Sequence, residues 1–147
     1  MDDRRRDYFA SVVFQSKRLS ECEQPKAALI VRGKSILGVG SNRTITTERT
    51  GKAGQTRRPI ESSPVFDALQ QFFSGPGYKG IGGRNENTQD PEEGGVAFLT
   101  YFPHVDELKL LYQSEIKKIY FFGDIDDEDS TNFINDLNYF EIINIEI

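Results

Sequence analysis

Residues 96–122 read VAFLTYFPHVDELKLLYQSEIKKIYFF, and their apolar pattern predicts three successive elements. Its first apolar run predicts a strand at 96–102, its central apolar residues recur at helical spacing and predict a helix at 103–115, and its last apolar run predicts a strand at 116–122. Pro103 suits the first turn of that helix, because its missing N–H would have no intrahelical partner there. A strand, a helix and a strand in succession indicate two parallel strands joined by a crossover helix.

Elements of the same two kinds are expected on both sides of this stretch. Apolar periodicity, a glycine-bearing turn and a Ser-Pro helix start indicate five of them. They are an amphipathic helix at 4–21, a β-hairpin at 27–42, a helix at 63–73, a short helix at 131–137 and a strand at 139–147.

This order predicts an α/β fold, a three-layer α/β/α sandwich around a mixed five-stranded sheet. The first two strands form an antiparallel hairpin, and the later strands are expected to be mainly parallel. The polar stretches 43–62 and 75–95 are expected to be loops, and the second is long, glycine-rich and expected to be mobile. A length of 147 residues suits a single domain over residues 1–147.

Composition excludes several classes of protein. The net charge of −5 and the pI near 5.0 argue against a general nucleic-acid binder, which needs a basic face. The single cysteine, Cys22, excludes an intramolecular disulfide and any zinc site built from several thiolates. No apolar run approaches the roughly 18 residues that a membrane span needs, and the N-terminus lacks a signal-peptide core. We therefore expect a cytoplasmic protein without a membrane partner.

Three segments of the sequence, in this order, resemble the deoxycytidylate (dCMP) deaminases of the cytidine deaminase superfamily. Residues 27–42, AALIVRGKSILGVGSN, are similar to the family's first strand and its glycine- and asparagine-containing turn. SPVFDALQQF at 63–72 stands where the family keeps its histidine-alanine-glutamate helix. Residues 96–122 are similar to its strand ending in threonine, an aromatic and proline-cysteine, followed by a helix and an isoleucine-lysine-lysine strand. The resemblance covers nearly the whole chain apart from 75–95, and it implies the cytidine deaminase-like fold and assembly into homo-oligomers or hetero-oligomers.

The resemblance also implies a degenerate catalytic site. In these enzymes one histidine and two cysteines hold zinc, and a glutamate moves protons. Val65 falls at the histidine ligand, Asp67 at the glutamate, and His104 and Glu107 at the two cysteines. Because valine offers no lone pair, we expect neither zinc nor dCMP deaminase activity. Two interpretations of the remaining groups stay open. In the first, His104, Glu107 and Asp67 hold zinc or another divalent ion. In the second, His104 is a locally bonded residue at a helix start, and Asp67 and Glu107 are solvated.

A nucleotide pocket can persist without the metal. By the resemblance Asn42 contacts the sugar, and Tyr101 and Phe102 offer an aromatic wall to the base. Arg43, Arg57 and Arg58 are candidates for holding the phosphate. In the alternative interpretation Asn42 only supports a turn and the basic loop faces water. The expected function is a non-catalytic module that binds a pyrimidine deoxynucleotide or regulates a protein partner. The alternative is a divergent deaminase or other hydrolase with the altered metal site.

Overall fold

The computed structural model describes residues 2–45, 60–74 and 94–146. The chain opens with helix α1 and a short 3₁₀ turn, and a β-hairpin follows. The bounds in this half are α1 Asp3–Ser16, the 3₁₀ turn Lys17–Leu19, β1 Ala27–Arg32, β2 Ser35–Ser41, β3 Thr44–Ile45, β4 Ile60–Glu61 and α2 Pro64–Ser74. Strands and helices then alternate, with bounds β5 Val96–Leu99, α3 Val105–Gln113, β6 Lys118–Phe121, α4 Glu128–Leu137 and β7 Glu141–Asn144.

The main sheet has the order β2-β1-β5-β6-β7. Strand β1 runs antiparallel to both β2 and β5, whereas β5, β6 and β7 run parallel to one another. The α/β class, the mixed five-stranded sheet, the antiparallel hairpin and the parallel later strands are therefore confirmed. In the part of the chain that the structure describes, no helix is both long and apolar enough to cross a membrane.

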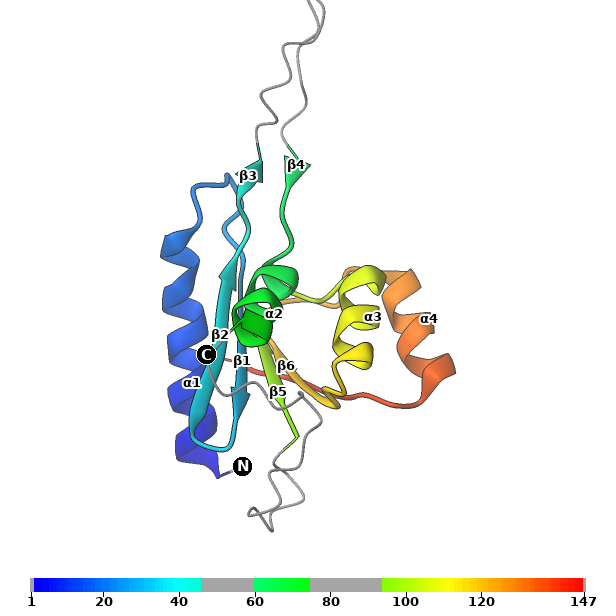
Figure 1. Cartoon of the computed structure of the whole chain (residues 1–147). Coiled ribbons are helices and arrows are strands. Elements are labelled where there is room, and N and C mark those ends of the chain that lie inside the picture. Colours follow the sequence, from blue (N-terminus) through cyan, green and yellow to red (C-terminus); the bar gives the residue numbers. More distant parts are fainter. Residues whose placement is uncertain (1, 46–59, 75–93, 147) are drawn as a thin grey trace, which may run out of the picture.

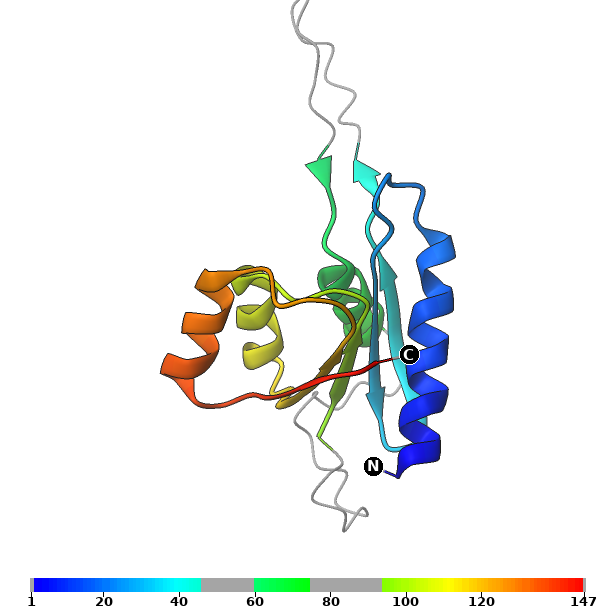
Figure 2. The same ribbon diagram turned by 180° about the vertical axis from the view of Figure 1, so that it is seen from behind.

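Helices cover both faces of this sheet (Figures 1 and 2). On one face α1 buries Phe9, Ala10 and Val13 against strand residues that include Leu29 and Phe98. Helices α2 and α3 pack on the opposite face, and half-buried apolar residues of α4 contact the same cluster. Each face owes its core to strand residues that alternate in direction, as the apolar runs of the sequence require.

Helix α2 lies unusually close to β2 because β2 carries glycine at two facing positions. A Cβ atom at Gly38 would stand 2.1 Å from the carbonyl oxygen of Ala68, and one at Gly40 would stand 2.0 Å from that of Pro64. No side chain fits there, so the two glycines set the distance between helix and strand. This contact fixes the first turn of α2, which forms part of the candidate site.

Several predictions from the sequence need correction. Pro103 precedes helix α3 instead of standing in its first turn, because His104 is the N-cap and the helix begins at Val105. Helix α4 begins at Glu128, before the predicted residue 131.

The first helix does not extend over 4–21, because its α-helical part ends at Ser16 and a 3₁₀ turn follows. The stretch 43–62 is not only loop, since Thr44–Ile45 and Ile60–Glu61 pair as the antiparallel strands β3 and β4. Two-residue strands in polar sequence show no alternation that a sequence pattern can detect. Residues 46–59, and all of the glycine-rich stretch except its last two residues, lie outside the described part.

Candidate functional site

A pocket of about 320 Å³ lies where the segment before α2 meets the segment between β5 and α3. Its walls come from residues that precede β1, follow β2, precede α2 and open α3. The lining residues are Lys26, Asn42, Glu61, Ser62, Ser63, Pro64, Tyr101, His104, Asp106 and Glu107. The volume is within the range of small-molecule sites. The pocket thus gathers residues that the sequence places in four separate segments.

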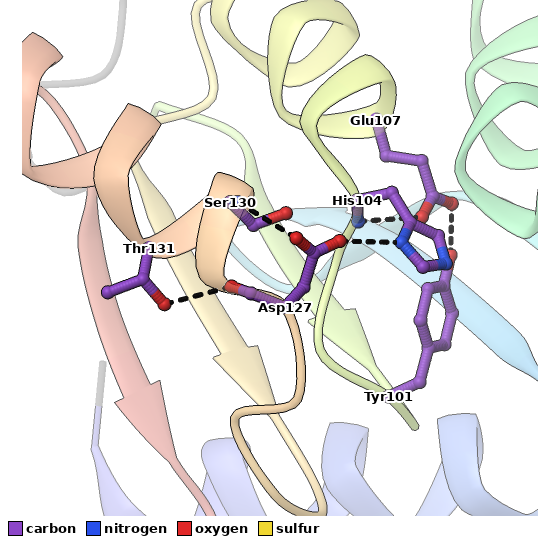
Figure 3. Close-up of polar contacts among 6 residues, drawn as sticks. All are labelled: Tyr101, His104, Glu107, Asp127, Ser130 and Thr131. Atoms are coloured by element: carbon purple, nitrogen blue, oxygen red, sulfur yellow. Dashed lines mark hydrogen bonds and ion pairs between the residues drawn. The ribbon is translucent and has the colours of Figure 1, made fainter.

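The carboxylate of Glu107 accepts three hydrogen bonds in the wall of the pocket. Glu107 is only 4% exposed, so the interpretation that its side chain is solvated is wrong. Its Oε2 accepts hydrogen bonds from the hydroxyls of Tyr101 and Ser63, the second at 2.7 Å. Its Oε1 accepts the backbone N–H of His104 at 3.2 Å, which closes the first turn of α3 (Figure 3). All of these donors are neutral, so among the described residues it is hydrogen bonds and a helix start that hold the buried carboxylate.

The ring of His104 is held by a carboxylate from another helix. His104 stands at the N-cap of α3, and its Nδ1 lies 2.9 Å from Oδ2 of Asp127, the N-cap of α4 (Figure 3). The other oxygen of Asp127 accepts the backbone N–H of Ser130 at 3.1 Å. The pair therefore ties the starts of α3 and α4 together. Asp127, the partner of His104, was not among the site residues predicted from the sequence.

Asp67 faces the edge of the sheet. Its Oδ2 accepts the backbone N–H of Ser41 at 3.3 Å and lies 3.6 Å from the guanidinium of Arg43. Asp67 does not belong to the pocket lining, and the side chain of Val65 is fully buried in the apolar core. The carboxylate aligned with the proton-moving glutamate is thus engaged in an ion pair and a strand contact.

The side chain of Asn42 forms three hydrogen bonds within the protein. Its Oδ1 accepts hydrogen bonds from the hydroxyl of Ser20 at 2.5 Å and from the N–H of Lys26 at 2.9 Å, while its Nδ2 donates to the carbonyl of Gln24 at 2.9 Å. Asn42 is 1% exposed and still borders the pocket. In the described structure it organises the segment that leads into β1.

The aromatic and basic candidates lie in different places. Tyr101 lines the pocket, with the ammonium of Lys26 5.2 Å from its ring centroid. Phe102 is buried in the core and packs edge-on against Phe121, at 5.1 Å between ring centroids. Arg43 is exposed and paired with Asp67. The remaining two candidates, Arg57 and Arg58, lie outside the described residues.

Two groups of the site have shifted acidity. Burial raises the pKa of the Tyr101 hydroxyl well above its ordinary value of 10.0, and the charge and hydrogen bond of Glu107 raise it further. The hydrogen bond from His104 lowers the pKa of Asp127 below its ordinary 3.8, and the Ser130 N–H lowers it further. Tyr101 therefore keeps its proton as a donor, and Asp127 stays ionised as an acceptor.

The side chains at the aligned ligand positions do not fit a zinc ion. Val65 is apolar, Glu107 is occupied by Tyr101, Ser63 and the His104 N–H, and the His104 ring contacts Asp127. Within residues 2–45, 60–74 and 94–146, no three His, Cys, Asp or Glu side chains are grouped so that they could hold a metal. Val65 thus offers no coordinating atom, and protein donors occupy both oxygens of Glu107.

Asp127, Ser63 and Lys26 were not predicted as site residues. For Asp127, one signal in the sequence could have indicated its place. Parallel strands bring the residues that follow their carboxyl ends to one edge of a sheet. Because β5 and β6 are parallel neighbours, the segments after them, which hold His104 and Asp127, meet at that edge. Ser63 and Lys26 carry no such signal, since each comes from a separate connection.

Comparison with solved structures identifies the fold. The dCMP deaminase from the cyanophage S-TIM5, in complex with dCMP and dUMP, matches with a TM-score of 0.70 and 18% identity, covering 99% of this chain and 99% of that chain. Its apo form gives 0.68 and 19%. RibD of Acinetobacter baumannii gives 0.55 and 14%, covering 96% of this chain and 35% of that one. No protein-family model and no curated protein matches the sequence. At these identities the likeness concerns the fold alone: the chain has the cytidine deaminase-like fold, seen also in dCMP deaminase and in the RibD deaminase domain.

Proposed function

We propose that this protein is a non-catalytic member of its fold, a regulatory module whose pocket binds a pyrimidine nucleoside or deoxynucleotide. The observation that carries the proposal is the Glu107 carboxylate, which accepts hydrogen bonds from Tyr101 and Ser63 where the resemblance puts a metal ligand. Because this carboxylate already accepts hydrogen bonds, exchanging them for a bond to a metal would gain little free energy. The pocket itself persists, and a protein of the same fold carries dCMP and dUMP.

The alternative, an enzyme with a metal held by His104, Glu107 and Asp67, requires these three side chains to turn toward one point. Asp67 would have to leave the Ser41 N–H and Arg43, and Glu107 would have to leave the hydroxyls of Tyr101 and Ser63. Each move breaks contacts of a carboxylate that the structure contains. The measurements of metal content and turnover described next distinguish this alternative from the proposal.

Metal content and turnover test the non-catalytic half of the proposal. Protein purified without chelator should carry far less than one zinc per chain, and EDTA should leave the Tm unchanged. Incubation with dCMP, dCTP or cytidine should give no deaminated product above a protein-free control. Zinc close to one per chain that survives dialysis, or clear turnover, would reject the proposal in favour of the altered metal enzyme.

Thermal shift tests the ligand half. A ligand that binds only the folded state stabilises it by about 2.7 kcal/mol at a hundredfold excess over its Kd. At least one pyrimidine nucleoside or nucleotide should therefore raise the Tm in a concentration-dependent way. Purine counterparts serve as controls. A flat response to the whole pyrimidine panel at millimolar concentration would remove the ligand and leave a protein-interaction module.

A regulatory module also needs a surface for a protein partner, and helices α2 and α3 offer one. Phe66 is 48% exposed beside a groove of about 140 Å³ that it lines together with Leu69 and Leu110. Exposed aromatic side chains around an apolar groove are typical of association surfaces. We take the partner to be a second copy of this chain. Light scattering should show an oligomer that Phe66→Lys weakens, whereas Ile125→Lys, at another exposed apolar residue, should not.

A further inference from the structure

The wall of the pocket carries more negative than positive charge. Among the described lining residues, Lys26 is the only lysine or arginine, and it faces three carboxylates, those of Glu61, Asp106 and Glu107. The exposed Glu61 and Asp106 are open to solvent, whereas Glu107 is buried. A bound group therefore meets one negative charge on the inner wall and two near the opening.

In the part of the chain that the structure describes, no cation forms an ion pair with the inner charge. Glu107 is held by the hydroxyls of Tyr101 and Ser63 and by a backbone N–H, and none of the described lysine or arginine side chains forms an ion pair with it. A buried charge is screened far less than an exposed one. Its field therefore acts on whatever occupies the pocket.

Two basic side chains near the pocket, Lys26 and Arg43, have partners within the described residues. The ammonium of Lys26 lies over the ring of Tyr101, and Arg43 is paired with Asp67 away from the lining. The Nδ1 of His104 faces Asp127, a further carboxylate just beyond the wall. A phosphate with two negative charges would thus meet a surplus of like charge in the described part of the site.

The same wall offers hydrogen-bond acceptors to a neutral ligand. The carboxylates of Glu61 and Asp106 accept without donating. Because Nδ1 of His104 serves Asp127, its Nε2, which has no hydrogen bond in the described structure, is left for a group in the pocket. N–H groups of a ligand would therefore find hydrogen-bond acceptors in this wall. Acceptor atoms of a ligand would find few donors among the described lining residues.

We infer that the pocket selects an uncharged nucleoside bearing an exocyclic amine and discriminates against its 5′-phosphate. This inference rests on the proposed pyrimidine-binding function and narrows its ligand class. It departs from the expectation that arginines of the basic loop attract a nucleotide phosphate. Charge repulsion at the wall is the selecting force, and the amine is read by the acceptors.

Isothermal titration of the full chain with deoxycytidine and with dCMP tests the inference. Deoxycytidine should bind at least about tenfold more tightly, a difference of about 1.4 kcal/mol. Raising the salt from about 0.1 M to about 1 M shortens the screening length from about 10 Å to about 3 Å, so the gap should narrow. Deoxyuridine, which has no exocyclic amine, should bind more weakly than deoxycytidine.

A charge-removing variant supplies the second measurement. Asp106→Asn removes one of the two charges near the opening while its amide oxygen still accepts a hydrogen bond, so the affinity ratio between deoxycytidine and dCMP should fall several-fold. Asp136→Asn removes the same charge from an exposed position of α4 outside the pocket lining and should change neither affinity. Equal or tighter binding of dCMP by the unmodified chain would overturn this inference while the proposed function stood. Failure of every pyrimidine ligand to bind would overturn both.

Discussion

Tyr101 donates its phenolic hydroxyl to the buried carboxylate of Glu107, six residues further along the chain. The donor follows strand β5, and the acceptor belongs to the first turn of α3. Their hydrogen bond joins the exit from the sheet to the start of the helix that borders the pocket. The bond is therefore expected to contribute to folding stability as well as to the shape of the site.

Tyr101→Phe should destabilise the fold by about 1 to 2 kcal/mol, because it leaves a buried carboxylate with one donor fewer. Ser63 and the His104 N–H remain bonded to Glu107, which limits the loss. Urea unfolding followed by circular dichroism measures the change. Tyr112→Phe removes a hydroxyl from an exposed tyrosine of α3 and should cost little. Equal effects of the two substitutions would contradict the role given to the Tyr101 bond.

Alkaline pH should expose the same contact. The pKa of Tyr101 is raised in the folded state, so the unfolded chain loses this proton first as the pH passes about 10. The folded state then binds more protons than the unfolded state, and stability falls with rising pH. The stability difference between the native chain and Tyr101→Phe should therefore shrink above about pH 10. A difference that stays constant from pH 8 to pH 11 would exclude this coupling.

Asp127→Asn should weaken the link between α3 and α4, and the effect should depend on pH. Asparagine still caps a helix, so the substitution removes mainly the charge that faces His104. Because the pKa of Asp127 is lowered in the folded state, its contribution is present above 3.8 and is lost as the pH falls through the folded value. The native chain should thus be more stable than the variant at pH 7, with the two converging in acid. Asp126→Asn, at the exposed neighbouring position, is the control.

Restoring ligands should restore metal binding if the alignment of the site is right. The triple variant Val65→His, His104→Cys, Glu107→Cys places one imidazole and two thiols at the three positions. It should retain close to one zinc per chain after dialysis, and EDTA should lower its Tm. A matched variant with Val65→Leu and the same two cysteines should hold zinc more weakly. A folded triple variant without zinc would show that the aligned positions do not converge.

Gly40→Ala should destabilise the fold by about 3 kcal/mol or more, because the new methyl group would meet a helix backbone that has no room to move aside. The added Cβ would stand 2.0 Å from the Pro64 carbonyl oxygen. Gly94→Ala is the control, since a Cβ there has no heavy atom within 4 Å. Thermal unfolding of both variants compares the costs. A mild effect at Gly40 would mean that α2 can shift away from β2.

The parts of the fold that were predictable are those with a strong local signal. The hairpin of β1 and β2 follows from two apolar runs around Gly33, which has a φ of +60° in the turn. The start of α2 follows from Ser63 and Pro64, and the Ser63 hydroxyl accepts the Phe66 N–H at 3.3 Å. By contrast, β3 and β4 depend on pairing between residues that a polar stretch separates, which no local pattern encodes.

The hydrogen bonds of the candidate site residues could not be predicted from the sequence. The resemblance brought Val65, His104 and Glu107 to one region, and the pocket borders the last two. Sequence alone could not tell that Asn42 and Asp67 would turn to internal partners, because their bonds to Gln24 and Ser41 form only after the chain folds. The orientation of a polar side chain depends on tertiary context more than on residue type.

The contact between Asp67 and the Ser41 N–H has a consequence for solubility. Strand β2 ends the five-stranded sheet, and the exposed edge of a terminal strand can recruit a strand from another molecule. Asp67 and Gln71, one helical turn apart on α2, accept the N–H groups of Ser41 and Val39. Two donors that would otherwise template intermolecular pairing are thus occupied from within the chain. Removing both side chains should leave the monomer fold in place while making the protein prone to aggregate through this edge.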